Sequence, residues 1–172
     1  MNTPGNVSVI TKTRRNHGLE HATINVLSER YPGLRLAGYS TPFGFSIVGP
    51  VPREALISAI DEAIRRVSAG RRGLVIHERC GTNYVAGGLL AGLAAWLSML
   101  GTKRSARSQL ERLPLVILLS TLALMFSPAL GTWLQRNVTT TNMLSGLEVV
   151  RITYGRFGKY PRFTVHTRYQ NI

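Results

Sequence analysis

The chain has 172 residues, a formal net charge of +13 and a single cysteine, which excludes an intramolecular disulfide. Its mean hydropathy of +0.05 conceals two long apolar stretches, because 21 lysines and arginines dilute them. The positive charge is spread over three regions and forms no one-sided basic stripe interleaved with aromatic residues. We therefore expect no nucleic-acid partner, and instead contact with a lipid bilayer that carries anionic head groups.

Residues 1–80 are predicted to form a small cytoplasmic domain of two helices on an antiparallel sheet, an α+β fold. Asn16 is a plausible N-cap for a first helix that runs to about Tyr31 and stops at Pro32-Gly33. Residues 53–69 form an amphipathic second helix, with one apolar face and two acid–arginine pairs at i,i+4 spacing.

The predicted strands are short. Apolar residues alternate with small or polar ones over residues 34–36 and 43–47, which indicates a two-stranded hairpin, and residues 74–76 read as a short buried strand. If Val7–Ile10 were also a strand, the order βαββαβ would be that of a ferredoxin-like sandwich. That topology would hold His17 and Cys80 at opposite edges of the sheet, so we keep α+β without the named topology.

Residues 81–135 are predicted to form a two-helix transmembrane hairpin. Residues 84–100 and 113–134 carry no charge and would span roughly 26 and 33 Å as helices, against a hydrocarbon core of about 30 Å. The alternative is a pair of buried core helices. Gly88 and Gly92 would let a membrane protein partner approach closely.

The ends of the chain are expected on the cytoplasmic side of the bacterial membrane. Residues 1–80 contain no apolar core typical of a cleavable signal, while basic residues on both sides of the hairpin leave the positive-inside rule ambiguous. Residues 136–172 are predicted to form a C-terminal β-hairpin, with strands over 147–154 and 163–169, that packs on the first domain. The expected protein is multi-pass with both termini cytoplasmic.

Metal-binding residue types gather in two short segments. His17 and His21 belong to an H-x-x-E-H string and lie one helical turn apart, a spacing that suits two imidazoles on one Zn²⁺ ion, with Glu20 as a general base. His77 and Cys80 lie where the first apolar run begins. We predict one site built from His17, His21, His77 and Cys80.

Other interpretations remain open. His17 and His21 lie nearly opposite the apolar face of their helix, which is typical of a solvated pair, and Cys80 alone would read as a buried structural residue. H-x-x-E-H is also the inverted zinc-peptidase signature, whose further carboxylate ligand could be Glu54, Asp61 or Glu62. Three protein ligands would make an open, catalytic zinc site, whereas four would make a closed, structural one.

The two segments also carry a resemblance. The strings NHGLEHATI at 16–24 and IHERCGTN at 76–83, with SPALG at 127–131 and TTT at 139–141, resemble a family of uncharacterised bacterial two-span membrane proteins over about residues 14–170. A wider group of metal-dependent membrane proteins carries H-G-x-E-H followed by H-P-x-C-G-T. This chain is similar to that group at His17, Gly18, Glu20, His21, His77, Cys80, Gly81 and Thr82, but has Glu78 in place of the proline.

The resemblance implies one site made by both segments and a metal-dependent enzyme. Two functions are therefore expected from the sequence. The first is a membrane-anchored zinc-dependent hydrolase in which Glu20 activates water; the alternative is a non-catalytic structural or assembly subunit of a membrane protein complex.

Overall fold

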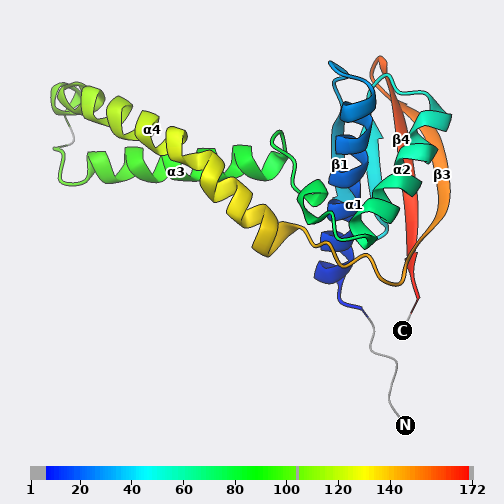
Figure 1. Cartoon of the computed structure of the whole chain (residues 1–172). Coiled ribbons are helices and arrows are strands. Elements are labelled where there is room, and N and C mark those ends of the chain that lie inside the picture. The colour runs from blue at the N-terminus through cyan, green and yellow to red at the C-terminus, as the bar shows by residue number, and fades with distance from the viewer. Residues whose placement is uncertain (1–6, 104, 171–172) are drawn as a thin grey trace, which may run out of the picture. The chain divides into compact units, whose positions relative to one another are not determined.

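The computed structural model describes residues 7–103 and 105–170, which divide into two compact units (Figure 1). Residues 1–77 belong with residues 136–172 in the first unit, and residues 78–135 make the second. The expected cytoplasmic location of the termini concerns residues 1–6 and 171–172, which lie outside the described residues.

Helix α1 spans Val9–Arg30 and starts earlier than predicted. The Ser8 side chain accepts a hydrogen bond from the Thr11 amide at 3.2 Å, which is the N-cap role predicted for Asn16. Asn16 is instead buried inside the helix, where its amide donates to the Thr41 carbonyl at 2.7 Å. The strand considered at Val7–Ile10 is therefore wrong, and with it the ferredoxin-like order.

The first unit contains one antiparallel sheet, in the order β1-β2-β4-β3. Its strands are β1 (Ala37–Thr41), β2 (Gly44–Val48), β3 (Leu147–Phe157) and β4 (Tyr160–Tyr169). The predicted C-terminal hairpin is confirmed, and it shares the sheet with the first hairpin because β4 pairs with β2. In the first hairpin the second strand is confirmed, but the strand predicted over residues 34–36 is wrong: these residues precede β1, and Leu34 and Leu36 pack against the core.

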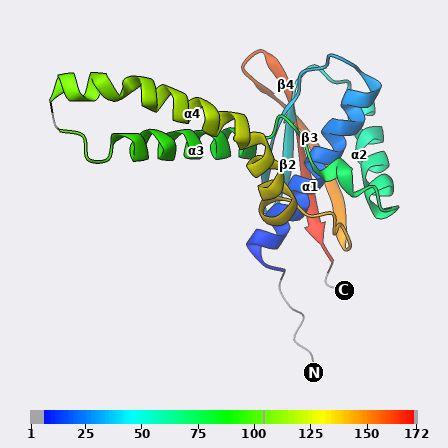
Figure 2. The same cartoon turned by 60° about the vertical axis from the view of Figure 1, so that its left-hand side comes forward.

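Helices α1 and α2 (Arg53–Ser68) cover one face of the sheet (Figure 2). The core between them is formed by fully buried apolar side chains, among them Leu19, Leu27, Phe45, Ile47, Leu56, Ile60 and Val165. Helix α1 contacts β1 and β2 as well as α2 and the 3-10 turn at Arg72–Val75. It is therefore covered on opposite sides, and the alternative of a solvated histidine pair is wrong for His21, which is 1% exposed, although His17 is half-buried.

The second unit is a helical hairpin of α3 (Gly81–Met99) and α4 (Ala106–Leu134), followed by one π-helical turn at Gln135–Thr139. Ser120 Oγ on α4 donates to the Ala91 carbonyl on α3 at 3.2 Å. A Cβ atom added at Gly87 would lie 3.2 Å from Ser127 Oγ, whereas nothing lies within 4 Å of such an atom at Gly88 or Gly92. The small residues at 87 and 91 therefore face α4, and Gly88 and Gly92 do not.

Among the described residues, one helix is long and apolar enough to cross a membrane. The stretch Ala106–Thr139 contains an 18-residue window of mean hydropathy 2.1, only 6% of which is buried. Such low burial argues against the alternative of a core helix. The predicted second span over residues 84–100 is not supported, because glycines, alanines and the polar start of α3 lower its apolarity.

Candidate metal centre

The centre is built on one polar stripe of α1, where His17, His21 and Asn25 follow one another at successive turns. The imidazole rings of His17 and His21 lie 4.3 Å apart, centroid to centroid. His17 Nδ1 lies 3.0 Å from the Thr139 carbonyl oxygen, and His21 Nδ1 lies 2.9 Å from that of Val75. A carbonyl oxygen only accepts, so both rings carry a hydrogen on Nδ1, and in the neutral form of each ring Nε2 is the atom that can bind a metal. Metal-binding histidines commonly have this arrangement.

Asn25 continues the stripe and was not predicted from the sequence. Its amide donates to the carbonyl oxygens of Leu74 and Ile76, both at 2.8 Å, while its Oδ1 accepts from His77 Nδ1 at 2.9 Å. One signal was present: asparagine is a poor helix former, so its presence one turn after His21 indicates a specific role.

These bonds explain why residues 74–76 are not the predicted strand. The carbonyl groups of Leu74, Val75 and Ile76 accept from Asn25 and His21 on α1, which hold the segment against this helix and not beside a strand. The segment forms a 3-10 turn instead and is held against α1. Residues 74–77 thus bring the chain past the histidine stripe just before Cys80.

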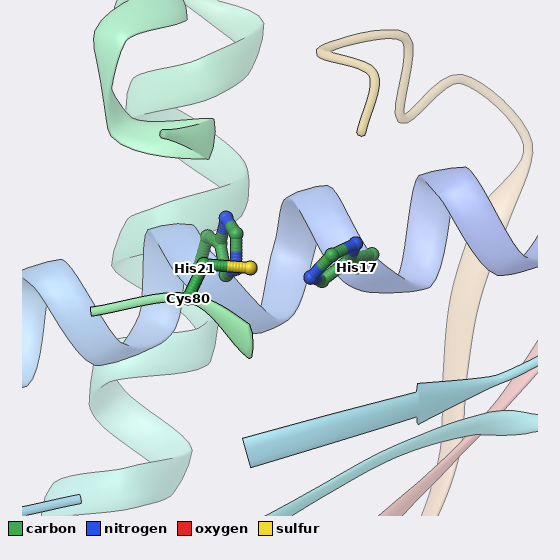
Figure 3. Close-up of side chains that lie close together, drawn as sticks. All are labelled: His17, His21 and Cys80. Carbon is green, nitrogen blue, oxygen red and sulfur yellow. The ribbon is translucent and has the colours of Figure 1, made fainter. Parts of the chain in front are cut away.

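Three of the four predicted ligands come together. Ligand atoms of His17, His21 and Cys80 all lie within 4.8 Å of one another (Figure 3). Cys80 is 6% exposed and is the N-cap of α3, where its Sγ accepts from the Thr82 amide at 3.4 Å. His77 is not part of this group; its ring centroid lies 5.7 Å from that of His21.

The predicted base, Glu20, is buried and lies outside the three-residue group. The Ser40 hydroxyl donates to its carboxylate, and a Cβ atom at Gly38 would collide with that carboxylate. Burial raises the pKa of Glu20 from 4.5 to about 6, although the Ser40 hydrogen bond and the charge of His17 lower it in part. Ser40 and Gly38 therefore form a cradle for Glu20 on β1, which the sequence pattern did not reveal.

The carboxylates considered for an inverted zinc-peptidase site are elsewhere. Glu62 forms ion pairs with Arg30 and Arg66, as predicted for the second of these arginines. Neither Glu54 nor Asp61 belongs to the group formed by His17, His21 and Cys80 in the described part of the chain. A carboxylate ligand from α2 is therefore not part of the centre.

The segment after α4 approaches α1 closely at Gly18, next to His17. A Cβ atom at Gly18 would overlap the carbonyl oxygen of Thr141. Arg14, one turn earlier, donates to the carbonyl oxygens of Asn137 and Thr140 at 3.1 Å each. The absence of a side chain at residue 18 thus allows the segment over residues 137–141 to lie directly on α1.

Comparison with known proteins gives the family. Residues 12–152 match the model of a domain of unknown function, DUF6391. The chain is similar to an uncharacterized protein of Picosynechococcus sp. (strain PCC 7002), with 34% identity over 172 residues that cover 92% of this chain and 80% of the relative. No solved structure matches the chain. The matched region includes both histidine segments, α3 and α4, and the protein belongs to the DUF6391 family.

Proposed function

We propose that this chain is an integral membrane protein with a zinc-dependent hydrolytic site at the cytoplasmic membrane surface. The observation that carries the proposal is the convergence of His17, His21 and Cys80 within 4.8 Å. Scattered residues of these types rarely gather so closely, since the described part of the chain contains four histidines and one cysteine.

The donor set suits zinc. Imidazole nitrogen and thiolate sulfur bind Zn²⁺ at about 2.0–2.3 Å, so tetrahedral ligand atoms lie roughly 3.3–3.8 Å apart. A separation of up to 4.8 Å requires only small side-chain adjustments to reach that geometry. The Nδ1 bonds of His17 and His21 to backbone carbonyls fix both rings and orient Nε2 as the ligand atom.

A set of three protein ligands favours a catalytic site over a structural one. Zn²⁺ bound by three residues keeps one position open and supplies Lewis acidity to a water molecule or a substrate oxygen. Glu20 neighbours His21 in the chain and lies close enough to His17 for their charges to interact. Its pKa of about 6 suits a group that accepts and releases a proton near neutral pH. Ser40 and Gly38 hold the carboxylate in place.

The membrane arrangement follows from the sheet. Strand β2 precedes the helical hairpin and β4 follows it, yet the two strands are hydrogen-bonded neighbours. Residues 7–77 and 136–170 must therefore lie on the same side of a membrane. If α4 crosses the bilayer, the chain must cross a second time, and α3 with its 19 residues is long enough at about 28 Å. We therefore propose two crossings, with this unit in the cytoplasm.

The wider resemblance supports the same proposal. The pairing of H-G-x-E-H with H-x-x-C-G-T is similar to that of metal-dependent membrane enzymes, and the structure brings three residues from the two strings together.

A non-catalytic assembly subunit is the second candidate, and two observations favour it. Glu20 accepts from Ser40 on β1 and is not part of the ligand group. Nothing in the described chain lies within 4 Å of a Cβ atom added at Gly88 or Gly92, so that face of α3 could accept a helix of a partner. In this function the metal would hold α1 to the start of α3.

Two matched pairs of variants test the proposal on the full chain in detergent. His21→Ala should lose zinc, measured by mass spectrometry of the metal, whereas His166→Ala on β4 should keep it. Glu20→Gln should keep zinc but lose roughly 100-fold or more of any ester or peptide hydrolysis, because an amide cannot accept the proton; Glu54→Gln should lose none. The same turnover in Glu20→Gln would overturn Glu20 as the base. Full zinc occupancy of the natural chain without any hydrolysis would contradict the hydrolase and leave the assembly subunit.

A further inference from the structure

The first turns of α1 form a surface whose apolar side chains face solvent. Val9 is 65% exposed and Ile10 is 71% exposed, at the start of a helix that is mostly buried from Asn16 to Leu27. The segment after α4 adds Val138 at 48% and Met143 at 67% exposure. We call these four residues the α1 end surface.

Hydrogen bonds hold the two parts of this surface together within the first unit. Arg14 donates to the carbonyls of Asn137 and Thr140, and Arg15 donates to that of Ser145 at 3.0 Å. Ile10 lies one turn before Arg14 on the same stripe of the helix, the stripe that faces residues 137–141. The exposed start of α1 is thus next to the chain that has just left α4.

The charged residues near the α1 end surface indicate which kind of partner would cover it. The segments 7–19 and 136–146 contain Lys12, Arg14, Arg15 and Arg136, and no aspartate or glutamate. Exposed aliphatic residues combined with cations in the same short segments are typical of a helix that lies in the head-group layer of an anionic membrane. The candidate span Ala106–Thr139 contains Val138 of this surface and ends four residues before Met143, so head groups are the nearest available partner.

From these contacts we propose that the α1 end surface lies in the membrane interface and binds anionic lipid head groups. Val9 and Ile10 enter the boundary of the acyl chains, while Lys12 and Arg136 contact the lipid phosphates. This inference rests on the proposed membrane location of α4. It adds a second, peripheral attachment that would hold the histidine stripe of α1 at the bilayer surface.

A photo-crosslinking amino acid tests the proposal in the full chain, reconstituted in lipid nanodiscs. Introduced in place of Ile10, it should give severalfold more lipid adducts by mass spectrometry than in place of Phe157. Phe157 is a matched control because it is exposed to a similar degree, 65% against 71% for Ile10, and lies at the far end of β3, about 33 Å along the strand from Leu147. Equal yields at the two positions would overturn the proposal.

Two further measurements show which part of the proposal fails, the membrane location of α4 or the contact of the α1 end surface with lipid. The crosslinker at Ile117 on α4 should give lipid adducts if α4 crosses the bilayer; their absence overturns the membrane proposal itself. Adducts at Ile117 without adducts at Ile10 overturn only the interface. The yield at Ile10 should fall severalfold when phosphatidylglycerol is replaced by phosphatidylcholine, and Lys12→Gln with Arg136→Gln should remove that difference. An unchanged yield in the neutral lipid would overturn the role of anionic head groups.

Discussion

The His21 imidazole donates its Nδ1 hydrogen to the carbonyl oxygen of Val75 over 2.9 Å, so a candidate metal ligand also joins two segments of the chain. The same stripe of α1 binds the two segments that flank the helical hairpin in the sequence. His21 and Asn25 bind the segment that leads to α3, and His17 and Arg14 bind the segment that follows α4. Folding of the first unit therefore orients the two histidine rings before any ion binds.

Asn25→Asp should destabilise the first unit by about 2–4 kcal/mol. The change removes two buried donors and places a carboxylate oxygen against the carbonyls of Leu74 and Ile76. Asn142→Asp, in the segment after α4, is the control and should cost less than about 1 kcal/mol. Thermal unfolding followed by circular dichroism measures both, and equal stability of the two variants would show that the Asn25 hydrogen bonds contribute nothing.

Gly18→Ala should also destabilise the chain, although alanine is the better helix former by about 1 kcal/mol. The added methyl group would overlap the Thr141 carbonyl and push residues 137–141 away from α1, at a cost of roughly 2 kcal/mol or more. Gly73→Ala meets nothing within 4 Å and serves as the control. A gain in thermal stability for Gly18→Ala would mean that the close approach at Thr141 is absent.

The sequence is informative where a single periodicity determines the structure. The alternation in residues 43–47 and in the C-terminal hairpin predicted β2, β3 and β4, and the amphipathic pattern predicted α2 within one residue at its C-terminal end. It is misleading at α1, because this helix is covered on opposite sides and its polar stripe is therefore not a solvent face. The sequence pattern of His17 and His21 is typical of a solvated pair, whereas His21 is 1% exposed and hydrogen-bonded to Val75.

The candidate site was predictable in part for the same reason. His17 and His21 are local partners at one-turn spacing, and Cys80 is near them in the structure as the paired strings indicated. The cradle of Glu20 depends on Gly38 and Ser40, which are small residues in an edge strand without any recognisable motif. The role of Asn25 depends on carbonyl groups more than 48 residues away, which no local pattern encodes.

Glu20 should make the stability of the zinc-free protein depend on pH. Its pKa is higher in the folded chain, about 6, than its ordinary value of 4.5, so folding favours the protonated carboxyl group. Ionising Glu20 in the folded chain therefore lowers the free energy of unfolding. This destabilisation is absent below about pH 4.5, grows as the pH rises through 6, and is constant at about 2 kcal/mol above that pH. The free energy of unfolding of Glu20→Gln relative to the natural chain should therefore rise by about that amount between pH 4 and pH 7. A difference that is flat across this range would show that Glu20 ionises normally.

Reporter insertions should place the hairpin loop on the opposite side of the membrane from both parts of the first unit. We expect a periplasmic signal from a reporter at residues 101–103, and cytoplasmic signals from reporters at Gly73 and Gly158. Both glycines leave open space around them, so insertions there should be tolerated. Signals from the same side at all three positions would show that α3 and α4 do not cross the bilayer.

X-ray absorption at the zinc edge of the purified full chain tests the central claim most directly. A first shell with two imidazole nitrogens and one sulfur, plus one additional light atom, is the predicted result, with zinc–sulfur and zinc–nitrogen distances of about 2.3 and 2.0 Å. Cys80→Ser should remove the sulfur contribution while His77→Ala leaves the shell unchanged. Zinc that binds without sulfur, or a protein that binds no stoichiometric zinc at all, would contradict a centre formed by His17, His21 and Cys80.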